Sequence, residues 1–422
     1  MRLLLKNVHI YNNGVFRRGS VAIDGGSILG FDCALEGAAV LDFGFSTCYV
    51  FPGFADVHVH LREPGFSYKE TILTGTKAAA RGGFAHVGAM PNVNPAPDRP
   101  AHLQLQADLI AKQAVVNVYP YGTITAGQEG KSLSEMEAIA PYVLAFSDDG
   151  KGVQSAKCME AAMAKAKSLG KIIAAHCEDN RFLNGGCIHD GAYARQNNLR
   201  GIPSQSEWRQ VRRDLQLAEK TGCAYHVCHV SCKESVELIR QAKQKGIDVT
   251  CETAPHYLIF DDSMLENHGR FKMNPPIRSR ADRKALIDGL LDGTIEMIAT
   301  DHAPHAPLEK NSGLAGSANG IVGLETAFPV LYTELVRTGV LTLEKLVSLL
   351  YENPAKRFGI GTPLAAGQPA TLTVFEVDTP YLVDPDEFQS MGKSTPFEGM
   401  QVYGRCLLTL CNGKIAWKER LL

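Results

Sequence analysis

The sequence lacks the features of a membrane or exported protein. No stretch of its 422 residues is apolar for long enough to span a bilayer. The apolar run at residues 3–5 ends at Lys6, so it is too short to form the core of a signal peptide. A formal net charge of -2 provides no overall attraction to nucleic acid or to a membrane surface. We therefore expect a cytoplasmic globular protein that has neither a nucleic acid nor a membrane as its partner.

The sequence also lacks a pattern of paired cysteines. It has 11 cysteines, an odd number, and most of them lie inside apolar runs. Cys228 and Cys232 are four residues apart, but no second pair follows that would complete a zinc knuckle. We interpret the cysteines as buried thiols in a reducing compartment.

The middle of the chain alternates strand-like apolar runs with helix-like stretches. Strands are predicted at residues 115–121, 142–146, 171–175, 224–230, 248–253 and 296–300. Helices are predicted at residues 134–140, 156–169, 233–244 and 280–291, with another before Thr221. Repeated alternation of this kind indicates a parallel sheet with helical crossovers. Over roughly 310 residues, this many units favours a closed (β/α)₈ TIM-type barrel over an open sheet.

The two ends of the chain contain only short strand-like runs broken by turns. Asn412-Gly413 is a strong hairpin signal near the C-terminal end, and Asn12-Asn13-Gly14 marks a turn near the N-terminal end. Neither end could bury a core alone. We predict that residues 1–48 and 362–422 pair into one small β-sandwich domain beside a catalytic barrel formed by residues 49–361.

A pair of histidines lies in the motif DVHVH at residues 56–60, after the apolar run at 49–54. On a strand, His58 and His60 share one face about 7 Å apart, so both would point inward at the end of the first barrel strand. One metal ion could then contact both imidazoles. Two histidines on a strand are also often structural, so this motif alone decides nothing.

Further candidates each close a predicted strand. His176, His229 and Asp301 stand at three such ends, and Asp148 and Asp149 follow a fourth. Active sites of these barrels are built at the C-terminal ends of the strands, so four histidines and two carboxylates would meet around one point. Imidazole and carboxylate ligands suit Zn²⁺ with a position left open for water.

Two other histidines are interpreted differently. His226 comes three residues before His229, on the opposite strand face, and is predicted to be a core or helix-facing residue. His256 follows a strand and is a weaker candidate for a supporting role at the metal.

Longer motifs occur along essentially the whole chain. They are DVHVHLREPG at residues 56–65, AMPN at 89–92, FSDDG at 146–150, AHCED at 175–179, HVCHVS at 226–231, KMNPP at 272–276, ATDHAPH at 299–305 and KSTPFEG at 393–399. In these motifs the chain resembles the dihydroorotases of the amidohydrolase superfamily. The resemblance implies a zinc-dependent enzyme that reversibly cyclises N-carbamoyl-L-aspartate to dihydroorotate in pyrimidine (UMP) biosynthesis.

The resemblance also implies a role for each candidate ligand. His58 and His60 would bind one zinc ion, His176 and His229 would bind the second, and Asp149 would bridge the two. Many relatives have a carboxylated lysine as the bridge, but Lys151 comes two residues later, past a glycine. The chain therefore resembles the aspartate-bridged branch, with two zinc ions per subunit.

The remaining implied roles concern the substrate. Asp301 would be both a metal ligand and the general acid/base, passing a proton from the attacking water to the departing ring nitrogen. The implied substrate-binding residues are Arg62, Asn92, Asn274, His305, Asn319 and Gly320. Arg62 offers a planar fork of donors that matches the unreactive substrate carboxylate, although a surface salt bridge is the alternative.

One segment departs from the family pattern. Relatives usually have Pro-Phe-Gly before Ile-Val-Gly, whereas this chain has Ala318-Asn319-Gly320 after a loop rich in glycine and serine. Backbone contacts from Asn319 and Gly320 to the substrate ring would tolerate this change. The alternative is that the loop is a mobile surface connection.

Other functions remain open on the sequence. A hydantoinase or allantoinase would share the barrel and the ligands, and Arg62 together with Asn92 argues against one. An inactive relative serving as a scaffold for aspartate transcarbamoylase would be expected to lack metal ligands, which this chain retains. We expect a homodimer, and association with a transcarbamoylase is compatible with catalysis.

Overall fold

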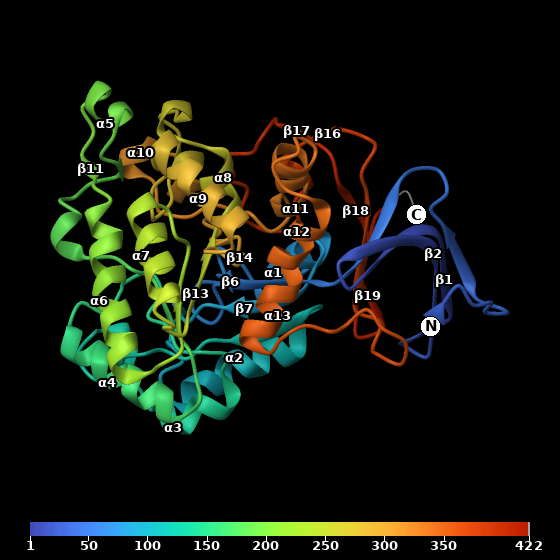
Figure 1. Ribbon diagram of the computed structural model, residues 1–422, viewed down its shortest axis with the longest axis horizontal. Coiled ribbons are helices and arrows are strands. Elements are labelled where there is room, and N and C mark those ends of the chain that lie inside the picture. The colour runs from blue at the N-terminus through green and yellow to red at the C-terminus, as the bar shows by residue number, and fades with distance from the viewer. Residues whose placement is uncertain (421–422) are drawn as a thin grey trace.

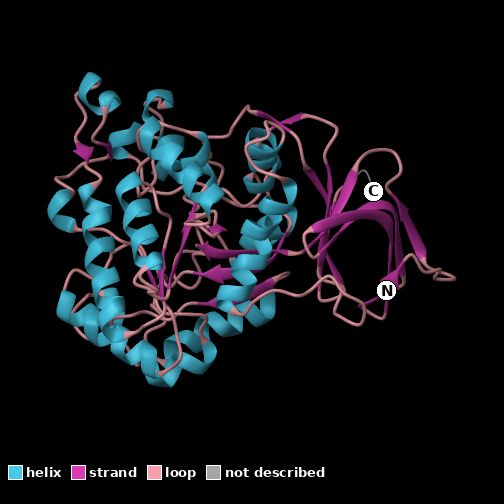
Figure 2. Ribbon diagram, viewed as in Figure 1, coloured by secondary structure: helices cyan, strands magenta, loops and turns pink. Residues whose placement is uncertain are grey.

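The computed structural model describes residues 1–420 and consists of two parts that lie side by side (Figure 1). The larger part is a barrel of strands surrounded by helices, formed by the middle of the chain. The smaller part is built from strands of both chain ends, drawn in dark blue and red. Figure 2 shows the same division as a helix-rich body next to a group of strands and loops.

Parallel strands form the wall of the barrel. They are β6 (Phe54–Val59), β7 (Phe84–Ala89), β8 (Asn117–Pro120), β9 (Ile173–Ala175), β12 (Tyr225–Val227), β13 (Val249–Thr253) and β14 (Met297–Ile298). Strands β6, β7 and β8 pair in that order, and β9, β12, β13 and β14 form a second run. Every residue of β6 and β7 is buried, as expected for parallel strands that are covered on both faces.

Single residues close the barrel between these two runs. Phe146 bridges in parallel to Gly122 on one side and to Ile173 on the other, so it occupies the place of the fourth strand. His302, beyond β14, bridges to Val59 of β6, and its carbonyl oxygen accepts from the His60 N–H at 2.8 Å. The predicted eight-stranded (β/α)₈ barrel is therefore confirmed.

Helices cover the outside of the barrel. They are α1 (Ile72–Arg81), α2 (Pro100–Gln113), α3 (Met136–Ile139), α4 (Ala156–Ser168), α5 (Ala192–Gln196), α6 (Gln205–Thr221), α7 (Lys233–Gln244), α8 (Pro255–Ile259), α9 (Arg280–Asp292), α10 (Gly313–Gly316), α11 (Ala327–Leu331), α12 (Leu343–Val347) and α13 (Asn353–Phe358). Single turns of 3-10 helix occupy Ala126–Gln128, Ala140–Tyr142, Asn180–Phe182, Asp262–Met264, Gly269–Phe271, Pro307–Lys310 and Pro385–Glu387, and π-helical turns occupy Tyr332–Val336 and Ser348–Glu352. On α7, the buried residues Val236, Ile239 and Ala242 recur at helical spacing and face the strands.

Two predicted elements need correction. The strand expected at residues 142–146 is reduced to the bridges of Phe146, because the chain before it forms a 3-10 turn at Ala140–Tyr142. The apolar run at residues 49–54 does not lead into one strand but is divided at Gly53. A Cβ at Gly53 would lie 2.4 Å from the Cβ of Ala85, so the chain passes too close to β7 for a side chain.

The two chain ends form a single sheet of eight strands. Its strands are β1 (Leu3–Asn12), β2 (Val15–Asp24), β3 (Ser27–Phe31), β4 (Ala39–Asp42), β5 (Cys48–Pro52), β15 (Leu372–Glu376), β18 (Arg405–Cys411) and β19 (Lys414–Lys418). The order is β19-β18-β15-β5-β1-β2-β3, with β4 beside β1. The ends meet where β5 pairs antiparallel with β15, so residues 49–52 belong to this sheet. Two short pairs of strands lie outside the barrel wall and this sheet. They are β10 (Ile188–His189) with β11 (Gly201–Ile202) and β16 (Tyr381–Leu382) with β17 (Gln401–Val402).

Aromatic rings join the sheet to the barrel. Phe51 of β5 and Phe375 of β15 pack against Phe54 at the start of β6, with ring centroids 5.5 Å and 5.8 Å away. Phe328 of α11 completes the cluster, 4.1 Å from Phe375.

Within residues 1–420, no helix has the length and apolar character that crossing a membrane requires.

Candidate metal centre and substrate pocket

Six side chains that the sequence analysis singled out converge at one end of the barrel. His58 lies on β6 and His60 directly after it, and the other four follow Phe146 at the fourth strand position, β9, β12 and β14. We call this group the metal centre: His58, His60, Asp149, His176, His229 and Asp301. All six residues are buried.

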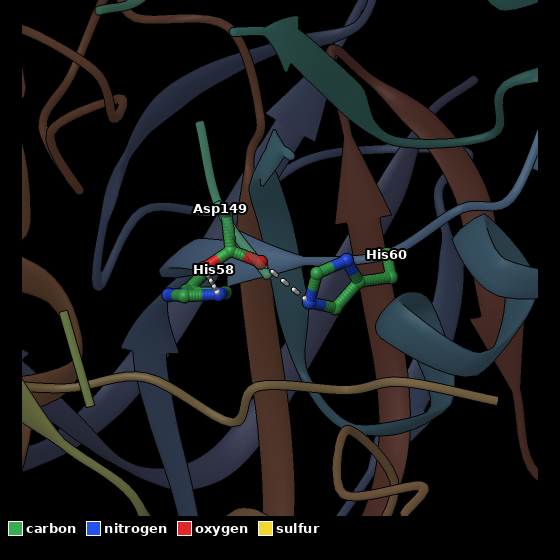
Figure 3. Close-up of side chains that lie close together, drawn as sticks. All are labelled: His58, His60 and Asp149. Carbon is green, nitrogen blue, oxygen red and sulfur yellow. Dashed lines mark ion pairs between the residues drawn. The ribbon is translucent and has the colours of Figure 1, made fainter. Parts of the chain in front are cut away.

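Asp149 stands at the middle of the metal centre. Its Oδ1 is 3.3 Å from His58 Nε2, 3.7 Å from His176 Nδ1 and 3.6 Å from His229 Nε2. Its Oδ2 is 3.5 Å from His60 Nε2 (Figure 3). One carboxylate therefore faces four imidazoles.

The ligand atoms form two groups that share Asp149. His58, His60 and Asp149 make one group, and Asp149, His176 and His229 make the other. Within each group, the ligand atoms lie within 4.8 Å of one another. A shared carboxylate between two sets of imidazoles has the arrangement of a bridging ligand.

The carboxylate of Asp301 joins the first group. Its Oδ1 is 3.0 Å from His60 Nε2 and 3.5 Å from His58 Nε2. The position after β14 brings Asp301 to the same end of the barrel as the strand-end histidines.

Unsatisfied atoms show that this cluster fits a cation. Among residues 1–420, His58 Nε2 and Asp149 Oδ1 are buried without a hydrogen-bond partner. Leaving such an atom unpaired costs about 1–3 kcal/mol, so a ligand at this point is expected. Imidazole nitrogen and carboxylate oxygen are donors that suit Zn²⁺.

The charges of the cluster favour the same conclusion. Burial by itself would raise the pKa of Asp149, but the imidazoles of His58, His229 and His60 hold it well below its usual range. Burial would lower the pKa of His58, but the carboxylates of Asp149 and Glu252 raise it well above its ordinary value. The cluster thus keeps Asp149 ionised and attracts positive charge to its centre.

The neighbouring aspartate, Asp148, has a different environment. Its Oδ1 accepts from the N–H groups of Ile124 at 2.8 Å and Thr125 at 3.1 Å, and its Oδ2 accepts from the Thr125 hydroxyl. Asp148 therefore stabilises the segment at Ile124 and Thr125 after β8, while Asp149 faces the histidines of the metal centre.

A pocket of about 180 Å³ opens beside the metal centre. It is lined by His60, Arg62, Asn92, Asp149, Gly150, His176, His229, Asn274, Asp301, Ala303, His305, Asn319 and Gly320. All six residues expected to bind the substrate are in this lining.

The arginine of the pocket is buried and oriented by the backbone. Arg62 Nε donates to the carbonyl oxygen of Pro304 at 3.1 Å. One terminal nitrogen lies 3.4 Å from His305 Nε2. Only 8% of Arg62 is exposed, which rules out the alternative of a surface salt bridge.

Glycine is also required at one position in the pocket lining. Gly320 has a φ of +133°, and a Cβ there would lie 2.6 Å from the carbonyl oxygen of Ala303. Three other residues of the site have left-handed backbone: Arg62 at φ 63°, His229 at φ 34° and Asp301 at φ 49°. Non-glycine residues in this region are strained, and such strain clusters at functional sites.

Comparisons with known proteins show the family of the chain. A family model described as "Dihydro-orotase-like" matches residues 48–235. The "Dihydroorotase" of Bacillus caldolyticus is 49% identical, covering 99% of this chain and 99% of that protein. The "Dihydroorotase" of Fusobacterium nucleatum subsp. nucleatum is 46% identical with the same coverage. The chain belongs to the dihydroorotase family.

Solved structures extend the comparison beyond dihydroorotases. An L-hydantoinase (dihydropyrimidinase) from Arthrobacter aurescens matches with a TM-score of 0.87 and 25% identity, covering 99% of this chain and 96% of that one. A D-hydantoinase (dihydropyrimidinase) from Thermus sp. matches with a TM-score of 0.83 and 25% identity over 99% and 95%. The chain thus shares its whole architecture with these two hydantoinases.

The sequence analysis missed a buried carboxylate beside His58 of the metal centre. Glu252 of β13 has its Oε1 2.6 Å from His58 Nδ1 and its Oε2 3.1 Å from His226 Nε2. His226, interpreted as a core histidine, is buried but belongs to this chain of contacts. An acidic residue inside the otherwise uncharged strand VTCET was the available signal, since buried acids normally have partners.

Two asparagines of the pocket, Asn92 and Asn274, are linked to histidines of the metal centre. Asn92 Oδ1 accepts from His60 Nδ1 at 2.7 Å, so this expected substrate residue also orients a histidine of the metal centre. Asn274 donates to Glu178 Oε1 at 2.6 Å, and Glu178 Oε2 lies 3.7 Å from His176 Nε2. Glu178 belongs to the AHCED motif at residues 175–179, and its approach to His176 is visible only in the structure.

A lysine beside the pocket was also missed. Lys69 Nζ is 3.2 Å from His305 Nδ1 and 2.7 Å from Glu309 Oε1. Burial, Arg62 and Lys69 lower the pKa of His305 to about 4, which keeps the imidazole neutral. With Nδ1 accepting from Lys69, His305 Nε2 donates to the carbonyl oxygen of Asn319 at 2.7 Å.

His256 lies close to the metal centre without joining it. Burial lowers its pKa to about 4, while the charge of Asp301 opposes this shift and that of His229 adds to it. His256 is therefore neutral near pH 7, and it lies close enough to Asp301 and His229 to interact with their charges.

Proposed function

We propose that this chain catalyses the reversible cyclisation of N-carbamoyl-L-aspartate to (S)-dihydroorotate in pyrimidine (UMP) biosynthesis. Relatives named "Dihydroorotase" match it over 99% of its length at 46% to 49% identity. The observation that carries the proposal is the buried guanidinium of Arg62 in the same pocket as Asp301. A cation there suits a substrate that has a carboxylate apart from its reacting amide.

We propose two zinc ions per subunit. His58 and His60 would hold one ion, His176 and His229 the other, and Asp149 would bridge them, with Asp301 as a further ligand of the first. When bound, the ions would polarise the reacting carbonyl and make water acidic enough to react near neutral pH. The support is the pair of ligand groups that share Asp149.

Asp301 is proposed as the general acid/base. In the direction of ring opening, its carboxylate takes a proton from the attacking water and passes it to the departing ring nitrogen. In the direction of ring closure, it moves the proton the opposite way. The position of its carboxylate in the pocket lining, 3.0 Å from His60 Nε2, supports this role.

The remaining pocket residues bind and orient the substrate. Arg62 would pair with the carboxylate through its planar fork of donors, and Asn92 would add an amide donor. Asn274, His305, Asn319 and Gly320 would enclose the ring and its polar groups. Because His305 is neutral and its Nε2–H is engaged by Asn319, it contributes shape rather than charge.

A hydantoinase or allantoinase activity is the second candidate. The solved structures with the same architecture, a hydantoinase among them, favour it. The buried Arg62 argues against it, because a hydantoin ring has no separate carboxylate to pair with that charge. An inactive scaffold is the third candidate, and the retention of all six residues of the metal centre argues against it.

Turnover of four compounds by the purified, zinc-loaded protein tests the proposal. We expect dihydroorotate to be opened, and N-carbamoyl-L-aspartate to be closed, with a far higher kcat/KM than hydantoin or allantoin. A preference for hydantoin or allantoin would contradict the proposal. Absence of all activity in a protein that holds stoichiometric zinc would favour the scaffold.

The domain boundary, the location and the partners of the chain are further proposals. We propose a β domain from the two chain ends and a catalytic barrel between them, with the boundary moved to follow β5.

The 11 free cysteines fit a cytoplasmic location, where thiols stay reduced. A homodimer, and association with aspartate transcarbamoylase, stay proposals that sedimentation of the purified protein with and without that partner would test.

A further inference from the structure

The loop that leads into Asn319 and Gly320 is held by a buried lysine. Lys310 stands at the start of this loop, and only 4% of the residue is exposed. Its Nζ donates to three backbone carbonyl oxygens: Lys272 at 3.0 Å, Ala318 at 2.7 Å and Gly320 at 2.6 Å. An ammonium group has three N–H donors, so all of them are used.

These contacts fix the far end of the loop at the pocket wall. The carbonyl oxygens of Ala318 and Gly320 are bound by Lys310, and the carbonyl between them, of Asn319, is bound by His305 Nε2 at 2.7 Å. The Gly320 N–H donates to Lys272 O at 3.0 Å. Side chains from outside the segment therefore hold three consecutive carbonyl groups.

The body of the loop has its own anchors. The Leu314 N–H donates to Asn267 Oδ1 at 3.0 Å, and the Ser312 N–H donates to Ser317 Oγ at 3.2 Å. A Cβ at Gly269 would lie 2.1 Å from Lys310 O, so the start of the loop packs directly on that backbone. Lys310 therefore contributes specifically to the end that lines the pocket.

A lysine is an unfavourable residue for simply filling this position. Burial and the neighbouring Lys272 lower the pKa of Lys310 to about 7, which shows how strongly the surroundings disfavour its charge. An apolar side chain would occupy the same space without that penalty. The hydrogen bonds to the segment that lines the pocket are what the lysine adds.

We propose that Lys310 is a positioning residue for the substrate: its ammonium group holds the carbonyls of Ala318 and Gly320 and thereby keeps Asn319 and Gly320 against the ring of the bound substrate. The inference rests on the proposed function, because it assigns these two residues to the substrate pocket. Lys310 itself does not line the pocket and takes no part in the proton transfer.

The first test separates binding from chemistry. Lys310→Met removes the donors and keeps a long apolar side chain. We expect the KM for dihydroorotate to rise about tenfold or more, with kcat changed by less than about threefold and zinc content unchanged. Lys171→Met is the matched control, since Lys171 Nζ donates to the carbonyl of Val143 at 2.6 Å before β9, at the other end of the barrel. The control should lose stability and keep the wild-type KM.

The second test is hydrogen–deuterium exchange of the zinc-loaded proteins without substrate. In Lys310→Met, peptides that cover residues 317–320 should exchange faster than in wild type, and peptides of the barrel strands should not. If this variant does not fold, Lys310→Gln, which keeps two N–H donors, is measured in the same two ways. Unchanged exchange would overturn the proposal, and so would an unchanged KM or a loss confined to kcat.

The two measurements also separate this inference from the proposed function. Wild-type protein that does not turn over dihydroorotate would refute the proposed function alone. The exchange comparison would still decide the positioning role, because it needs no substrate. Faster exchange in the variant supports that role, and unchanged exchange refutes it.

Discussion

Glu252 and His58, 194 residues apart in the chain, meet with Oε1 2.6 Å from Nδ1. The other ring nitrogen of His58, Nε2, faces Asp149 Oδ1 at 3.3 Å. A carboxylate on one nitrogen fixes the orientation of the ring and makes the other nitrogen a stronger ligand. Glu252 therefore supports the metal centre from behind.

The first prediction concerns this contact. Glu252→Gln keeps the shape of the side chain and removes its charge, so we expect zinc affinity to fall about 10–100-fold. Titration with a competing chelator measures the affinity. Glu325→Gln is the control, because Glu325 is a carboxylate buried beside Arg81, 2.7 Å away. Equal zinc affinity in wild type and Glu252→Gln would show that His58 needs no such support.

The second prediction compares two adjacent aspartates. Asp149→Asn should reduce bound zinc, because it removes the negative charge that faces four imidazoles. Asp148→Asn should keep its zinc and lower the melting temperature, because it weakens the hydrogen bonds to Ile124 and Thr125. Zinc analysis and thermal melting of both variants check this. If Asp148→Asn loses zinc and Asp149→Asn retains it, Asp148 and not Asp149 is the metal ligand.

The third prediction concerns the substrate carboxylate. Arg62→Met removes the charge and keeps similar bulk, so the KM for dihydroorotate should rise while zinc content stays the same. A lost charge-assisted contact corresponds to about 1.5–3 kcal/mol, or about 10–100-fold in KM. Steady-state kinetics measure the effect. An unchanged KM would mean that the carboxylate is bound elsewhere.

The fourth prediction separates ligation from proton transfer at Asp301. Asp301→Asn can still offer an oxygen to zinc but cannot carry a proton, so turnover should fall about 10²–10⁴-fold in both directions. Zinc content and substrate binding should persist. If Asp301 is only a ligand, the variant loses zinc and added zinc restores the rate. If it only stabilises the turn, activity persists and the melting temperature falls.

The fifth prediction concerns acid stability. Burial lowers the pKa of His86 from 6.5 to about 4. Between these values, the unfolded chain binds a proton at this position and the folded protein does not, so stability falls as the pH is lowered through this range. The full effect, reached below the folded-state pKa, is about 3 kcal/mol. His86→Gln should show a weaker decline of melting temperature from pH 7 to pH 5, whereas the exposed control His268→Gln should follow wild type.

Local patterns in the sequence were sufficient for the barrel and for the ends of its strands. The predicted helices at residues 156–169 and 233–244 match α4 and α7 to within one residue, because apolar residues recur at helical spacing. Strand ends were visible as polar residues after apolar runs, and the parallel barrel brings such ends to one face. The positions of His176, His229 and Asp301 along the chain were therefore enough to mark them as candidate ligands.

Only the tertiary structure decided which side chains support the candidate ligands and the pocket residues. Glu252, Lys69 and Lys310 stand in stretches without a recognisable motif, and their roles depend on partners that lie far away in the sequence or across a loop. The division at Gly53 depends likewise on the close passage of β7. Periodicity and strand-end position are local properties of a chain, whereas the pairing of one buried charge with another depends on how distant segments pack, which no short stretch of sequence records.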